Sequence, residues 1–103
     1  MMESEDARLL AEMQRLLLAF RLNLADVGPL ADRLLAMRDR LTFQDRDWSF
    51  ELTQHIATLD SASTFTPANE AEAHQLRSAL VAATNSLLEL IEAKVRNRND
   101  NNS

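Results

Sequence analysis

The chain has 103 residues, of which 46% are apolar and 26% are charged, as in an ordinary single globular domain. The absence of cysteine excludes a disulfide framework and a thiolate metal site. One glycine and two prolines supply too few turn residues for a fold with many hairpins. Sixteen acidic and eleven basic residues give a formal net charge of −5, so the chain lacks the basic surface that nucleic-acid-binding proteins need.

The negative charge is concentrated in the second half of the chain. Residues 45–92 carry eight acidic and two basic residues, whereas residues 1–44 carry seven acidic and six basic residues. Because opposite charges attract and steer association, a basic protein surface is the natural complement of the acidic segment. The alternative interpretation is a solvated surface that keeps the protein soluble.

Hydrophobic periodicity predicts an all-α fold. Apolar residues recur at steps of three and four, which is the period of a helix with one buried face. We expect a small bundle of about four helices, near residues 5–24, 29–42, 46–61 and 67–96.

The last predicted helix differs from the others in its length and in the width of its apolar face. We expect it to begin at Thr66-Pro67, an N-cap followed by the residue best suited to a first helical turn. Its apolar residues form two adjacent stripes, which predicts a central position with two neighbours. Residues 1–95 then form one domain, and the polar residues 96–103 are expected to be a disordered tail.

The length of this helix leaves two packing arrangements open. The two middle helices could lie end to end beside it, or it could overhang them and expose residues 87–95 to a partner or a second copy. The second arrangement would allow a homodimer. The candidate residues of this oligomer seam are Leu87, Leu88, Ile91 and Val95.

No group of residues predicts catalysis. His55 and His74 each follow a glutamate by four residues, which is the spacing of a surface ion pair, whereas di-metal helix bundles use a Glu-x-x-His spacing. Glu89 and Glu92 lie on the polar side of their helix, and a single glycine cannot build a phosphate-binding loop. We therefore expect no enzyme, no catalytic residue, no metal site and no cofactor.

The start of the third predicted helix combines aromatic and acidic residues. Trp48 is predicted either to pack at the edge of the core or to serve as an interface anchor. Phe50 falls off the apolar stripe, so it either forms an exposed patch with Asp47 and Glu51 or covers a helix end. An exposed aromatic side chain with acidic neighbours is a typical composition for a binding hot spot. The candidate partner-binding residues are Asp47, Trp48, Phe50, Glu51 and Asp60.

The segment from Asp45 to Leu80 resembles small helical immunity proteins in its apolar pattern, which is followed by a turn and another helix. The residues of this pattern are Trp48, Leu52, Ile56 and Leu59. The resemblance implies a helical protein that neutralises a partner. We expect a non-catalytic module that inhibits, neutralises or chaperones a basic partner protein, as immunity proteins, phage inhibitors or export chaperones do. The alternative is a homo-oligomeric scaffold or assembly subunit.

The expected location is the cytoplasm of a bacterium. Ten arginines against one lysine are typical of a GC-rich bacterial or phage genome. The first residues are acidic where a signal peptide would be basic, and no apolar run is long enough to cross a membrane. We therefore expect neither a membrane nor a nucleic acid as a partner.

Overall fold

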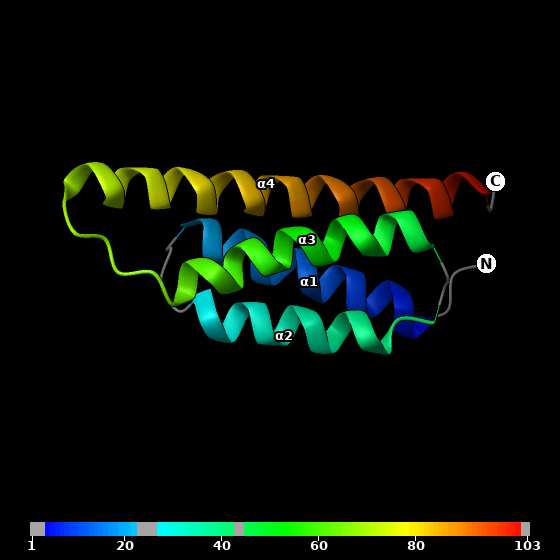
Figure 1. Cartoon of the computed structure of the whole chain (residues 1–103). Helices are drawn as coiled ribbons and strands as arrows, with labels where there is room; N and C mark the ends of the chain where they lie inside the picture. Colours follow the sequence, from blue (N-terminus) through cyan, green and yellow to red (C-terminus); the bar gives the residue numbers. More distant parts are fainter. Residues whose placement is uncertain (1–3, 23–26, 43–44, 102–103) are drawn as a thin grey trace.

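The structure, a computed structural model, describes residues 4–22, 27–42 and 45–101. These residues form four helices and no strand: α1 (Ser4–Leu22), α2 (Val27–Arg40), α3 (Arg46–Ser63) and α4 (Glu70–Asn101). Successive helices run in opposite directions along the bundle (Figure 1). The predicted all-α bundle of four helices is therefore confirmed.

The four helices form a closed ring around one core. α4 packs against two neighbours, α1 and α3, as its wide apolar face predicts. α1, α2 and α3 also have two neighbours each, in the ring order α1–α2–α3–α4, so α4 does not hold the central position predicted for it. α2 and α3 lie side by side, so the end-to-end arrangement predicted as one alternative is wrong. The surface between α1 and α2 and the surface between α3 and α4 therefore lie on opposite sides of the ring.

Each helix contributes one apolar stripe to the core. On α3 this stripe is the predicted set, and its four members are all at most 8% exposed. Helical spacing explains the stripe, because residues three and four apart lie on one side of the helix. The buried apolar residues are Leu9, Leu10, Met13, Leu17 and Phe20 of α1, Leu30, Ala31, Leu34 and Met37 of α2, Trp48, Leu52, Ile56 and Leu59 of α3, and Leu80, Ala83, Leu87 and Ile91 of α4.

α4 overhangs the rest of the bundle at its N-terminal end (Figure 1). A helix of 32 residues spans about 48 Å, which accounts for the 51 Å long axis of the molecule. Leu80 is the first fully buried residue of α4, and Leu76, one turn earlier, is partly buried against the core, so the overhang consists of residues before Leu76. The predicted overhang thus exists at the opposite end of the helix from residues 87–95.

Two local hydrogen-bond motifs fix where α3 and α4 begin. The Asp45 carboxylate caps α3 by accepting from the Trp48 backbone N–H at 3.1 Å. At α4 the Asn69 side chain accepts from the Glu72 N–H at 2.9 Å, and Glu72 accepts in return from the Ala68 N–H at 3.2 Å. This reciprocal cap starts α4 at Glu70, so the predicted start at Thr66-Pro67 is wrong.

The far end of α4 also differs from the prediction. The helix continues to Asn101 and therefore includes residues 96–101, which were expected to belong to a disordered tail. Residues 102–103 lie outside the described residues. The expected end of the first helix, at residue 24, lies outside the described residues, and α1 is described as far as Leu22. The second helix was expected to end at residue 42, but α2 ends at Arg40.

A buried carboxylate joins the start of α1 to the end of α2. Asp6 is 1% exposed and accepts hydrogen bonds from the Thr42 backbone N–H at 2.9 Å and from the Thr42 hydroxyl. Asp45 caps α3, so the Thr42 side chain is available to bond across the bundle.

Candidate protein-binding site

A shallow groove runs between α3 and α4 on the acidic side of the ring. It has a volume of about 220 Å³ and is bordered by two glutamates, Glu51 on α3 and Glu89 on α4. The spacing of Glu51 and His55 on one helix places both on the same edge, one turn apart. The full lining is Glu51, His55, Ser86, Glu89, Leu90 and Ala93, which we call the acidic groove.

The carboxylates of the acidic groove have no cation within ion-pair distance among the described side chains. The same is true of Asp47, one turn before Glu51, and of Glu92, one turn after Glu89. Elsewhere Glu5 is paired with Arg40 and Glu12 with Arg15, whereas Asp32 and Glu70 also lack an ion pair but lie apart from each other. Unpaired carboxylates therefore gather beside the acidic groove, where a basic surface could approach them.

Phe50 stands beside this charge as an exposed aromatic residue. Its side chain is 64% exposed, and Asp47 lies three residues before it on the same helix. It is one of four large apolar residues that are exposed in the described part of the chain. Phe50 and Asp47 together are available to a partner without any rearrangement of the core.

Asp60 is not part of this surface. It follows Glu51 by nine residues, which corresponds to about half a turn around the helix and about 13 Å along it. Asp60 lies on the edge of α3 that faces α2, seven residues after Thr53, whose hydroxyl accepts a hydrogen bond from Arg38 at 2.8 Å. Asp47 and Phe50 are therefore neighbours on one exposed face of α3, Glu51 borders the acidic groove, and Asp60 lies apart from both.

Trp48 is a core residue, which decides between its two predicted roles. It is 8% exposed, and its indole N–H donates to the backbone carbonyl of Leu90 at 2.8 Å. This bond crosses from α3 to α4, so Trp48 holds together the two walls of the acidic groove. A partner could contact the indole only by opening the bundle.

Asp45 and Lys94 form a second link between α3 and α4. The Lys94 ammonium donates to the Asp45 carboxylate and lies 5.4 Å from the centre of the Trp48 ring, within cation–π range. The hydrogen bond from Lys94, followed by the one from the Trp48 N–H, lowers the pKa of Asp45. This cluster neutralises Asp45 and Lys94 locally, so neither adds to the charge of the groove.

The predicted oligomer seam is occupied within the monomer. Leu87 and Ile91 are completely buried, and Leu88 and Val95 are partly buried against the same core. The reason is that α1 and α3 both cover this side of α4. The seam residues are therefore internal packing residues, and Leu88 also lines a surface groove.

The two Glu–His pairs do not form the predicted ion pairs. Neither Glu51 and His55 nor Glu70 and His74 approach within 4 Å, although the spacing allows it. Within the described ranges, no three histidine, aspartate or glutamate side chains gather closely enough to hold a metal ion. His55 contributes a polar, partly buried ring to the acidic groove instead.

The α4 wall of the groove was missed by sequence reasoning. Ser86, Glu89 and Ala93 carry no motif, and Glu89 was interpreted only as part of a solvated pair with Glu92. The available signal was the concentration of negative charge on both α3 and α4. Sequence does not reveal which two helices are neighbours, so it could not assemble the groove.

Comparisons of this chain with protein-family models, curated proteins and solved structures gave no match. None of the helices, as far as the structure describes them, has the length and apolar character required to cross a membrane. The class that can be stated is a small antiparallel four-helix bundle with one acidic groove.

Proposed function

We propose that the protein is a non-catalytic binding module that inhibits, neutralises or chaperones a basic partner protein. The observation that supports this most directly is the acidic groove, whose carboxylates have no cation within ion-pair distance among the described side chains. A partner that brings lysines or arginines to Glu51 and Glu89 would supply the missing opposite charges. Its volume of about 220 Å³ lies below the usual range of small-molecule sites, and its open form suits protruding side chains of a protein partner.

Charge and apolar contact would have different tasks in this binding. Glu51, Glu89 and Asp47 would raise the association rate by attraction over about 10 Å, the screening length at moderate salt. Phe50 would supply buried apolar area after contact, as aromatic hot-spot residues do. Trp48 would act indirectly, because it fixes the spacing of α3 and α4.

The test uses a charge-neutral variant with a matched control. We would immobilise the wild-type protein and the double variant Glu51→Gln/Glu89→Gln, and capture partners from host lysate at low and moderate salt. The control is Asp32→Asn/Glu70→Gln, which removes the same charge from exposed positions outside the groove.

The expected result is a basic protein captured by the wild type and the control but lost from the groove variant. Stopped-flow measurements with that protein should then show a lower association rate and a weaker salt dependence for the groove variant. Equal capture by both variants would contradict the assignment to the groove.

A homo-oligomeric scaffold is the second proposal, and a different groove favours it. Between α1 and α4, Leu18 is 40% exposed beside Leu88, with Arg21 and Glu92 at the margins. In a two-fold symmetric dimer each Arg21 could face the Glu92 of the other copy. Light scattering tests this proposal by measuring the mass of the wild type and of Leu18→Glu in solution. The wild type should be a dimer and the variant a monomer, and a monomeric wild type would exclude the scaffold.

A further inference from the structure

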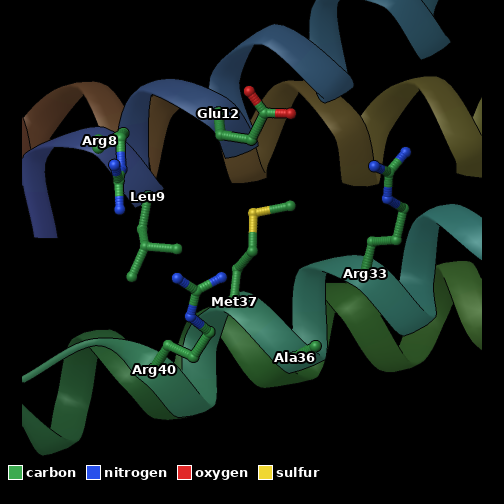
Figure 2. A pocket seen from close by; sticks show the side chains of 7 residues that line it. All are labelled: Arg8, Leu9, Glu12, Arg33, Ala36, Met37 and Arg40. Atoms are coloured by element: carbon green, nitrogen blue, oxygen red, sulfur yellow. The ribbon is translucent and has the colours of Figure 1, made fainter. Parts of the chain in front are cut away.

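A second hollow lies between α1 and α2, on the opposite side of the ring from the acidic groove. Its volume of about 480 Å³ is within the range of small-molecule sites. Leu9 and Met37 give it an apolar floor, and charged side chains from both helices surround them (Figure 2). The charged residues are Arg8, Glu12, Arg33 and Arg40.

The charges of this hollow are positive in excess, although the protein as a whole is acidic. Arg40 is paired with Glu5 at 2.7 Å, and Glu12 is paired with Arg15. Arg8 and Arg33 have no acidic partner within 4 Å among the described residues. The hollow therefore keeps an excess of positive charge, which favours an anionic ligand.

The polar groups are divided between two ends of the hollow. Because α1 and α2 run antiparallel, Arg8 lies near Arg40, and Glu12 lies near Arg33. The two ends are about 10 Å apart, since Arg33 and Arg40 are separated by seven residues of helix. Figure 2 shows Arg8 and Arg33 reaching from their own helices toward the other helix, on either side of Met37.

The middle of the hollow suits a flat ring. The Met37 thioether is polarizable and makes favourable contacts with aromatic rings, and Leu9 extends the apolar surface beside it. At the far end Arg33 can donate hydrogen bonds, and Glu12, whose two oxygens already accept from Arg15, has lone pairs left to accept a further one. A ligand that satisfies all three regions carries an anionic group at one end and a polar heterocycle at the other.

We propose that this hollow binds a small organic phosphate of the nucleoside monophosphate class. Arg8 and Arg40 hold the phosphate through their planar guanidinium groups, which match phosphate oxygens two at a time. Met37 and Leu9 support the base, and Glu12 and Arg33 bond to its polar edge. The site shares no residue with the acidic groove, so it does not depend on the proposed function.

Glu5 competes with the phosphate for Arg40. In the unbound protein the Glu5 carboxylate accepts a hydrogen bond from the Arg40 guanidinium, and a bound phosphate must displace this carboxylate. Removing the charge of Glu5 should therefore strengthen binding, whereas removing the charge of Arg8 should weaken it. Opposite effects from two exposed residues of one helix would not arise from a general loss of folding.

The test is isothermal titration calorimetry at low ionic strength with AMP, adenosine and inorganic phosphate. Arg8→Gln should raise the Kd for AMP about tenfold, the value of one charge-assisted hydrogen-bonded contact, and Glu5→Gln should lower it. The matched controls are Arg77→Gln and Glu70→Gln, exposed residues of α4 that should leave the Kd unchanged.

Adenosine and inorganic phosphate should each bind at least about tenfold more weakly than AMP, because each fills only one end of the hollow. Absence of AMP binding, or equal Kd values for Arg8→Gln and Arg77→Gln, would overturn the proposal. Inorganic phosphate that binds as tightly as AMP would also overturn it. A Glu5→Gln variant no tighter than Glu70→Gln would overturn the role of Arg40.

Discussion

Trp48 and Phe50 lie two residues apart on α3, yet the structure predicts that only the substitution of Trp48 lowers the stability of the fold substantially. Trp48→Phe should destabilise the fold, because it removes the indole hydrogen bond to Leu90 and part of a buried ring. The hydrogen bond contributes about 0.5–1.5 kcal/mol, and each lost buried carbon contributes about 0.8 kcal/mol. We expect the free energy of unfolding to fall by about 2–3 kcal/mol.

Phe50→Ala should leave the stability nearly unchanged. The ring is 64% exposed, so little apolar area returns to water when it is removed. Burying a whole phenylalanine contributes about 1.5–3 kcal/mol, and the covered third therefore contributes about 0.5–1 kcal/mol. Alanine is the better helix former by about half a kcal/mol, which offsets most of this loss.

Urea unfolding followed by far-UV circular dichroism measures both variants. Fluorescence is unsuitable because Trp48 is the single tryptophan. The melting temperature of Trp48→Phe should fall by about 10–20 °C, since about 1 kcal/mol corresponds to 4–8 °C in a domain of this size. Binding of the captured partner by Phe50→Ala should weaken about tenfold or more if Phe50 is a hot spot. A stable Trp48→Phe, or a Phe50→Ala that unfolds more easily than Trp48→Phe, would refute the assignment.

The remaining predictions concern stability and pH. Leu87→Ala should lower the free energy of unfolding by about 2.7–5 kcal/mol, because Leu87 is completely buried. Chemical denaturation measures this loss, and a loss below about 1 kcal/mol would contradict the place of Leu87 in the core. Asp6→Ala should cost about 1.5–3 kcal/mol in the same assay by removing both bonds from Thr42, and an unchanged denaturation midpoint would argue against that link. The pKa of Asp45 is lower in the folded protein than in the unfolded chain, because the carboxylate accepts hydrogen bonds from Lys94 and from the Trp48 N–H. The stability that these bonds contribute is therefore fully present above the unfolded pKa of about 3.9. It is lost as the pH falls through the lower pKa of the folded protein. Thermal melts between neutral pH and pH of about 3 should therefore show a smaller acid-induced loss for Asp45→Asn than for the wild type, and parallel curves would contradict this.

Helix boundaries show how local hydrogen bonding corrected the sequence interpretation. Thr66-Pro67 is a recognised start signal, but Asn69 with Glu72 forms a reciprocal cap three residues later. Both combinations can be found in the sequence. The second one starts the helix, because its two side-chain hydrogen bonds satisfy the backbone N–H groups of Ala68 and Glu72.

The candidate site shows the same limit at the level of packing. Asp47, Phe50 and Glu51 could be selected from the sequence because they share one helix and avoid its apolar stripe. Asp60 was selected for its charge alone, and it lies on the edge of α3 that faces α2. Glu89 belongs to the groove only because α4 is the neighbour of α3 on that side.

The sequence by itself determined the helical class, the number of helices and the core stripe of α3. The 3.6-residue period and the shortage of turn residues act within one segment, so they can be interpreted without knowing what the segment packs against. The ring order of the helices, the burial of Asp6 and the occupation of Leu87 and Ile91 were decided by tertiary structure. These features depend on which distant segments become neighbours, and an apolar stripe or a charged side chain does not specify its partner.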